Sequence, residues 1–324
     1  MIGPRLFGAS VAAVLAMAGP AAQAQDFPNR QITIVVGLAP GGITDVTARI
    51  YADALSKGIG QRVVVENRQG AGGAVGAAAV QNAPPDGHTV LIFSGSQHMA
   101  VPAMAATAPY EPLKGFAPVS LLFHLATLIT VPDALPVKTL PELFAYGKSK
   151  PGGLTFGSPG VGTPSHMLAA VLGRATSTPM QFAHYRGGGP MMADLITGRV
   201  DFALSSYTAA KGQFLEKKLR ALAIDADKRW EIMPEVPTLA ELGHGNEKVA
   251  SWFGVAAPAG TPPAIVQKLN EEFVKASRDS ELVRRLTENG SPIATTTPEQ
   301  MAKLMADEWA NTVKLVELLD LKQK

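Results

Sequence analysis

The sequence predicts an α/β protein in which a leader segment precedes two α/β units with parallel strands. The first observation is that β-branched runs alternate with helical patterns along most of the 324 residues. The second is a composition of 32 glycines, 25 prolines and 6% aromatic residues, which suits many short turns better than a β-sandwich. Alternating strands and helices are typical of parallel sheets joined by right-handed crossovers. About 300 residues after the leader suffice for two domains of common size, or for one large domain.

The first segment of the chain is typical of a secretory signal peptide. Arg5 precedes an apolar run over residues 6–18, and Ala22, Gln23 and Ala24 form an A-x-A cleavage site. The run is too short and too rich in alanine for a comfortable membrane span, which needs roughly 18 or more apolar residues. We therefore expect a signal peptide over residues 1–24, cleavage after Ala24 and a periplasmic mature protein.

Composition and motifs exclude several classes of function. The formal net charge of +2 gives no basic field for nucleic acid, and the absence of cysteine excludes disulfides, thiol chemistry and the usual zinc sites. The six histidines are scattered, and neither a nucleophile elbow nor an H-E-x-x-H motif occurs. Residues 70–76 lack the third glycine of a dinucleotide motif, because Val75 stands there. We expect no catalytic residue, no metal, no cofactor and no nucleic-acid partner, so an enzyme is not expected.

The first unit has a β-α-β-α-β order. Its expected strands and helices, from hydrophobic periodicity and turn signals, are strand 32–36, helix 45–56, strand 62–66, helix 74–81 and strand 89–93. Two more apolar runs, 117–122 and 125–131, follow with no long helix between them.

The second unit restarts the pattern after Thr139. Its expected elements are helix 140–148, strand 154–156, helix 164–173, strand 180–184, helix 190–197, strand 200–203, helix 212–218 and strand 219–224. The last expected elements are strand 252–256 and helices 262–277, 281–289 and 298–321. Extended runs near 125–131 and 252–256 imply two crossings between domains. We therefore expect domain 1 over residues 25–124 and 251–324, and domain 2 over residues 125–250.

A glycine turn over residues 37–49 is the first candidate binding feature. Pro40, Gly41 and Gly42 turn the chain after a strand, and Thr44 is expected to cap the next helix. A strand, a glycine turn and a helix N-terminus present unpaired N–H groups and the positive end of a helix dipole. This arrangement favours an anion without a charged side chain. An ordinary βα turn would explain a single such motif about equally well.

Loops of the same kind follow other strands. Residues 157–163 lead into a helix with Thr163 and Pro164 as N-cap and first helical residue, residues 185–189 precede another helix, and residues 94–98 form a polar loop. Open α/β sheets bind ligands at the carboxyl ends of their strands. Two loops from each unit are therefore expected to face each other across a cleft and close on a small anion.

These loops, in this order, resemble the solute-binding proteins of tripartite tricarboxylate transporters, also called the Bordetella uptake gene family. The similarity covers nearly the whole mature chain and rests on residues 39–49, 65–73, 85–88, 116–120, 157–166, 185–190, 219–223, 234–238 and 257–262. It implies a two-domain periplasmic binding protein of type II-like architecture, with the ligand cleft between two α/β domains joined by two crossing strands. It also implies a monomer that captures a small organic carboxylate for membrane permease subunits.

The resemblance also assigns the ligand-binding residues. In the family, backbone amides and bridging waters of the first two loops hold one carboxylate, and the rest of the pocket sets specificity. The matching residues of the first two loops are Pro40, Gly41, Gly42, Thr44, Asp45, Ser158, Gly162, Thr163 and His166. The others are Ser94, Ser96 and His98 after the third strand, Gly187 and Gly188 in the third glycine loop, and Ser205.

One position departs from the family pattern. Ser205 and Ser206 stand where many members place an acidic or amide residue near the cleft. A protonated amine on the ligand would lack that partner, so the expected ligand is a non-amino mono- or dicarboxylate.

Two other functions remain open at this point. A binding protein read by a membrane sensor kinase would need the same closure on its ligand. An exported hydrolase or transferase would use His166 or His98 with a nearby serine, but no nucleophile elbow supports it.

Overall fold

A computed structural model describes residues 27–322 of the chain, apart from several single positions and pairs. The positions outside the description are 39, 42, 126, 162, 186–187, 227, 248, 250 and 289–290, together with the side chains of Ile43 and Ser96. The expected signal peptide and the site candidates Gly42, Gly162 and Gly187 therefore lie outside the described residues. In the part that is described, no helix is long and apolar enough to cross a membrane.

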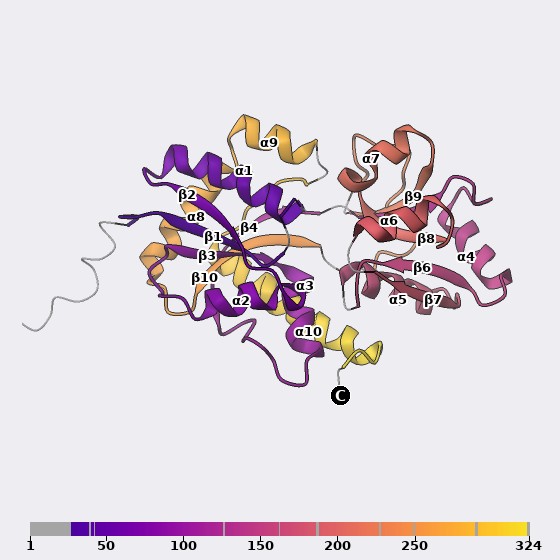
Figure 1. Cartoon of the computed structure of the whole chain (residues 1–324), viewed down its shortest axis with the longest axis horizontal. Coiled ribbons are helices and arrows are strands. Elements are labelled where there is room, and N and C mark those ends of the chain that lie inside the picture. The colour runs from indigo at the N-terminus through magenta and orange to yellow at the C-terminus, as the bar shows by residue number, and fades with distance from the viewer. Residues whose placement is uncertain are drawn as a thin grey trace, which may run out of the picture.

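The chain forms two lobes, each built on a five-stranded mixed sheet (Figure 1). The sheet of lobe 1 has the order β2(Val63–Asn67), β1(Ile32–Val36), β3(Thr89–Ser94), β10(Trp252–Pro258), β4(Phe116–His124). The sheet of lobe 2 has the order β7(Met180–His184), β6(Leu154–Ser158), β8(Phe202–Ser206), β5(Thr127–Pro132), β9(Leu219–Asp225). In each sheet the first three strands pair in parallel, and the fourth runs antiparallel to both of its neighbours. The predicted α/β class with two units is confirmed.

Helices cover both faces of each sheet. The helices of lobe 1 are α1(Ile43–Gly58), α2(Ala74–Gln81), α3(Gly95–Met104), α8(Pro263–Ala276), α9(Ser280–Thr287) and α10(Pro298–Leu318), with a 3₁₀ turn η2(Ala71–Gly73). The helices of lobe 2 are α4(Leu140–Ser149), α5(Pro164–Ala175), α6(Gly188–Ile196) and α7(Tyr207–Leu215).

The apolar run of β1 shows why its strand lies in the centre of a covered sheet. Ile34 and Val36 pack in the cluster that contains Tyr51 of α1 and Phe273 of α8. Val35 points to the other face and packs with residues of α2, α3 and α10. Successive strand residues point to opposite faces, so burial on both faces requires a continuous apolar sequence.

The helix α3 is the main element that the sequence analysis did not predict. Residues 94–98 were expected to form a polar loop, but α3 begins at Gly95, directly after β3. Its sequence contains glycine and Pro102, both unfavourable inside helices. The helix is held by tertiary packing instead, since Met99 and Ala100 are buried.

Several helix starts also differ from the expectation; α6, for example, begins at Gly188 and not at Pro190, and two other differences concern caps. The helix α1 begins at Ile43, so Thr44 lies inside its first turn and the prediction of Thr44 as the cap is wrong. The helix expected at 212–218 spans Tyr207–Leu215, because the Ser206 side chain caps it by accepting a hydrogen bond from Ala209 N–H.

The helix α10 connects the two lobes. Its first half packs in lobe 1, where Met301 and Met305 are buried, whereas Val316 belongs to an apolar cluster that joins Ala100 and Met104 of α3 to the core of lobe 2. Beyond the helix, Asp320 has a φ of 51°. Leu321 N–H donates to Val316 O at 3.0 Å, which places Leu321 in that cluster too. This pattern is a Schellman C-cap with its usual apolar contact.

Candidate functional site

The first predicted loop, between β1 and α1, is closed by a carboxylate. Gly41, with a φ of 83°, donates its N–H to Asp45 Oδ2 at 2.9 Å. Arg49 Nε donates to the same oxygen at 3.1 Å, and Arg49 Nη2 donates to Asn67 Oδ1 at 3.0 Å. Asn67 Nδ2 in turn donates to Leu38 O at 3.1 Å. The network fixes the turn from inside, so Asp45 holds the loop in shape.

The charge of Asp45 follows from these contacts. Burial raises the pKa of its carboxyl, but hydrogen bonds from Arg49, Gly41 N–H and Asn67 outweigh burial and hold the pKa below its usual value. Asp45 is therefore an anion at neutral pH. Thr44 is buried beside it, whereas Pro40 is exposed at the turn.

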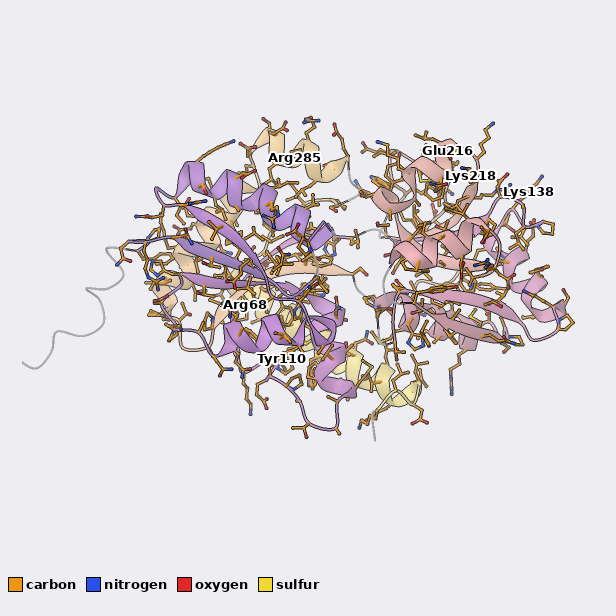
Figure 2. All side chains as sticks on the ribbon, viewed as in Figure 1. Arg68, Tyr110, Lys138, Glu216, Lys218 and Arg285 are labelled. Atoms are coloured by element: carbon orange, nitrogen blue, oxygen red, sulfur yellow. The ribbon has the colours of Figure 1, made fainter. Side chains whose placement is uncertain are left out.

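The third predicted group, after β3, lies inside lobe 1. The His98 ring stacks on Phe93 with centroids 4.9 Å apart, and Ser94 N–H donates to His98 Nδ1 at 2.9 Å. Tyr110, labelled in Figure 2, donates its hydroxyl to His98 O at 2.8 Å. His98 Nε2 has no hydrogen-bond partner among the described residues and points toward Gly73. The side chain is 2% exposed, and burial lowers its pKa to about 4.

The corresponding loop of lobe 2, between β6 and α5, is held by two hydrogen bonds to the carbonyl of Gly160. Ser158 Oγ donates to Gly160 O at 2.7 Å, and Thr163 Oγ1 donates to the same oxygen at 2.8 Å. Thr163 Oγ1 also accepts from His166 N–H at 3.3 Å and so caps α5, as predicted. These contacts hold Ser158, Gly160 and Thr163 in place relative to one another before any ligand arrives.

His166 meets a second imidazole at the end of β7. The ring centroids of His166 and His184 lie 4.9 Å apart with the planes near perpendicular, and Phe182 contacts both rings. Burial first, and then the charge of His184, lower the pKa of His166 to about 4. His184 is exposed. The sequence analysis did not select it, although its position directly before the glycine loop at 185–189 was a usable signal.

The remaining candidates of lobe 2 are placed as follows. Ser205 is buried, and its hydroxyl lies 2.7 Å from Thr130 Oγ1 inside the sheet. Gly188 is exposed at the start of α6. The candidates thus lie at the carboxyl ends of β1 and β3 in one lobe and of β6, β7 and β8 in the other.

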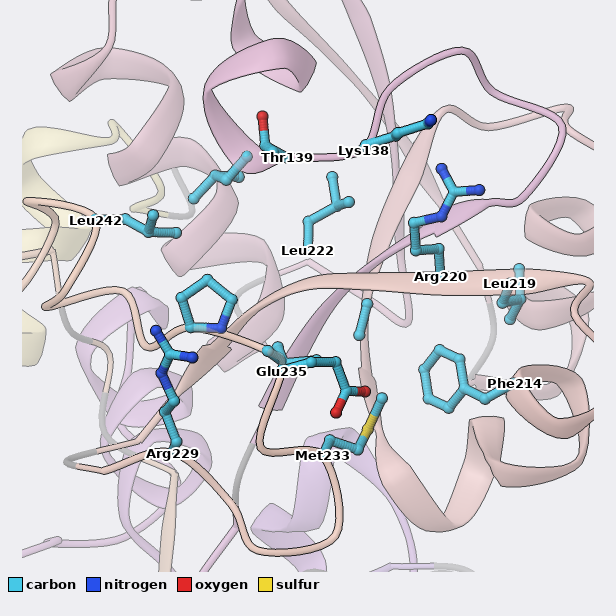
Figure 3. Close-up of a pocket in the computed structure, with 14 residues that line it drawn as sticks. Lys138, Thr139, Phe214, Leu219, Arg220, Leu222, Arg229, Met233, Glu235 and Leu242 are labelled. Atoms are coloured by element: carbon cyan, nitrogen blue, oxygen red, sulfur yellow. The ribbon is translucent and has the colours of Figure 1, made fainter.

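A pocket of about 560 Å³ lies elsewhere in lobe 2 (Figure 3). It is bounded by β9, the start of α4 and the segment 229–242, and none of the predicted site residues lines it. Its two arginines are engaged, since Arg220 pairs with Asp133 and Arg229 pairs with Glu241. Over the described ranges, no three His, Asp or Glu side chains gather as a metal site would require.

A family model described as tripartite tricarboxylate transporter family receptor matches residues 47–321. The chain belongs to this family. The predicted resemblance is therefore confirmed. BugT of Bordetella pertussis (strain Tohama I) is 35% identical over 306 residues, which cover 93% of this chain and 94% of BugT.

Solved structures agree with this membership. The periplasmic binding protein BugD has a TM-score of 0.80 at 28% identity, covering 92% of this chain and 100% of BugD. MatC from Rhodopseudomonas palustris with bound malate has a TM-score of 0.77 at 33% identity, covering 90% and 100% of the two chains. An R. palustris protein with adipate has a TM-score of 0.81 at 32% identity, covering 90% and 98%. The fold is that of a two-domain periplasmic binding protein, as predicted.

Proposed function

We propose that this chain is an extracytoplasmic solute-binding protein that captures a small mono- or dicarboxylate for the membrane subunits of a tripartite tricarboxylate-type transporter. The observation that carries the proposal is the match of nearly the whole chain to a receptor family, together with its similarity to solved proteins that hold malate and adipate. We further propose that the mature protein begins after Ala24, acts as a monomer in the periplasm and closes a cleft between its lobes on the ligand.

The proposed domains are residues 25–124 with 251–324, and residues 125–250. The composition of the two sheets supports this division, since β10 joins the strands of lobe 1 while β5 to β9 make the sheet of lobe 2. The two chain crossings run side by side, as Leu125 N–H donates to Ser251 O at 2.7 Å. Paired crossings of this kind suit a hinge between two rigid bodies.

The loop geometry supports binding by the backbone. Asp45 holds the described part of the first loop, and Ser158 and Thr163 hold Gly160 O in the second. We propose that the loop N–H groups outside these contacts bind the carboxylate. Fixed N–H groups near helix N-termini favour a carboxylate, and bridging waters can complete its hydrogen bonds. We propose that the residues named in the sequence analysis form the site: the loop amides contact the ligand, and side chains such as Asp45, Ser158 and Thr163 hold the loops in shape.

The histidines of the site support a binding role over a hydrolytic one. His98 and His166 are enclosed, and burial lowers the pKa of each to about 4. A general base works best when its pKa lies near the operating pH, so these two imidazoles are poorly suited to activate a serine at neutral pH. We propose that the protein has no catalytic residue, and an ester or amide turnover assay should give no activity.

A thermal-shift screen tests the proposed function. Residues 25–324 are mixed with mono-, di- and tricarboxylates and with amino acids, and a ligand at 100 times its Kd should add about 2.7 kcal/mol to folding stability. We expect hits confined to non-amino carboxylates. An amino acid that binds as tightly as the best carboxylate would contradict the ligand class. No shift with any compound, in a sample that native mass spectrometry shows to be empty, would contradict the function.

A further inference from the structure

One exposed imidazole at the carboxyl edge of the lobe 2 sheet makes no hydrogen bond to any residue that the structure describes. We propose that His184 binds the ligand directly and makes the site prefer a dicarboxylate over the monocarboxylate of the same length. This inference rests on the proposed carboxylate-binding function and names the part of the site that would select the ligand.

The strand register places His184 beside the second ligand loop. His184 is the last residue of β7 and pairs with Ser158, the last residue of β6. The next residue continues this contact, since Tyr185 N–H donates to Ser158 O at 2.8 Å. The His184 backbone is therefore fixed next to the point where the loop of residues 158–163 leaves the sheet.

Two aromatic neighbours orient the His184 ring without using its nitrogens. Phe182 lies parallel to it, with planes 11° apart and centroids separated by 6.2 Å. The His166 ring is near perpendicular to it, with centroids separated by 4.9 Å. Neither nitrogen of His184 has a hydrogen bond to a described residue, and the side chain is exposed. A ring held by aromatic contacts, with no described residue bonded to its nitrogens, is a pre-oriented hydrogen-bond donor.

Three hydroxyl groups of the predicted site, all in lobe 2, are already engaged within the protein. Ser158 and Thr163 both donate to Gly160 O, and Ser205 pairs with Thr130. These side chains shape the site, but their protons are committed elsewhere. These three hydroxyls are therefore poor donors for a second carboxylate on the lobe 2 side of the site.

The titratable groups of the predicted site do not supply that donor either. Asp45 is an anion tied to Arg49, and an anion repels a carboxylate. His98 and His166 are 2% and 6% exposed, so both are enclosed within their lobes. Of the imidazoles at these loops, His184 is the one that is exposed at the strand ends.

The chemistry of the His184 imidazole suits the binding of a second carboxylate. An imidazole donates a hydrogen bond from an N–H in its neutral form and carries a positive charge when protonated. Hydrogen bonds between a charged donor or acceptor and its partner are roughly twice as strong as neutral ones. A monocarboxylate held by the loop amides would leave His184 facing an apolar chain end, whereas a dicarboxylate would satisfy it.

Calorimetry with matched ligand pairs tests the proposal. The probes are adipate against hexanoate and succinate against butanoate, because each pair differs by one carboxylate at constant chain length. The proteins are the wild type, His184→Gln and the control Gln181→Ala, an exposed residue of the same strand. We expect the wild type to prefer one of the dicarboxylates by about tenfold or more, since a hydrogen bond to a charged group contributes about 1.5–3 kcal/mol.

The outcomes separate this inference from the proposed function. His184→Gln should reduce the preference to within about threefold by weakening dicarboxylate binding alone, while Gln181→Ala should keep it. Equal weakening of both members of a pair, an unchanged preference in His184→Gln, or no dicarboxylate preference in the wild type would each overturn the role of His184. A wild type that binds no carboxylate in the thermal-shift screen would instead overturn the proposed function.

Discussion

Glu308 is a carboxyl group buried inside lobe 1, on α10. Its side chain is 6% exposed, and Thr312 Oγ1 lies 3.5 Å from Glu308 Oε1. Burial raises the pKa of Glu308 to about 7, although the nearby Trp252 indole and Thr312 hydroxyl lower it in part. The folded protein therefore holds the proton of Glu308 more tightly than the unfolded chain does.

The raised pKa predicts a loss of stability as the pH increases. Below the unfolded value of 4.5 both states are protonated, and between 4.5 and about 7 only the unfolded chain ionises. At about 1.4 kcal/mol for each pKa unit, the burial of Glu308 should lower the free energy of unfolding of the wild type by up to about 3 kcal/mol above pH 7. Glu308→Gln should remove this dependence. Measured by urea unfolding, the free energy of unfolding of the wild type should therefore fall relative to that of the variant between pH 4.5 and pH 8. A difference that stays constant over this range would contradict the prediction.

The backbone conformation of Gly41 predicts that adding a side chain there lowers stability through backbone strain alone. Gly41 has a φ of 83°, and a Cβ built on it would meet nothing within 4 Å. Gly41→Ala should therefore lower the free energy of unfolding by about 1–2 kcal/mol through its backbone conformation. Gly188→Ala is the matched control, because a Cβ there also meets nothing and its backbone is not in the left-handed region. Equal stability of the two variants in urea would show that the turn at Gly41 is not strained.

Secondary structure was predictable wherever periodicity and turn residues agreed. The bounds of α2 and β7 match the predicted 74–81 and 180–184 because apolar runs there end at clear breakers. The helix α3 was not predictable, since its glycine and Pro102 argue against a helix and its packing depends on distant residues. Thr44 was assigned as a cap from residue type alone, whereas the helix begins one residue earlier.

The site was predictable in its loops and less so in its side chains. Strand order places loops at the carboxyl edge from sequence alone, and the fastening of Gly160 O by Ser158 and Thr163 fits the expected second loop. The enclosure of His98 depends on Phe93, Tyr110 and Gly73, which come from other parts of the chain. The exposure of His184 depends likewise on its place on an edge strand.

Two helix caps in lobe 2 give a paired prediction. Thr163 caps α5 beside the ligand loop, and Thr139 caps α4 away from it by accepting from Glu142 N–H. Thr163→Ala and Thr139→Ala should each lower the free energy of unfolding by about 1 kcal/mol, the usual value of an N-cap. Only Thr163→Ala should weaken carboxylate binding in calorimetry, because it also releases Gly160 O. Weaker binding in both variants would mean that the loss of stability alone causes it.

The whole molecule should unfold as one unit because α10 joins its lobes. Val316 and Leu321 pack in an apolar cluster that joins α3 of lobe 1 to the core of lobe 2, while Met301 of the same helix packs in lobe 1. Differential scanning calorimetry of the wild type should therefore show a single transition. Deleting residues 319–324 removes the Schellman cap and Leu321, and should separate the unfolding of the lobes into two transitions. Two transitions in the wild type would contradict this coupling.

The position of β10 also determines the order in which the lobes can form. β10 lies between β3 and β4, yet it is the last strand along the chain. The sheet of lobe 1 stays divided until residues 252–258 arrive, whereas the strands of lobe 2 all lie within residues 127–225. A chain that emerges from its N-terminus, as in synthesis or export, can therefore complete the middle of its sequence first. The strands of lobe 1 that are made first remain unpaired with β10 until residues 252–258 are available. During that interval the edges of β3 and β4 can pair with other chains.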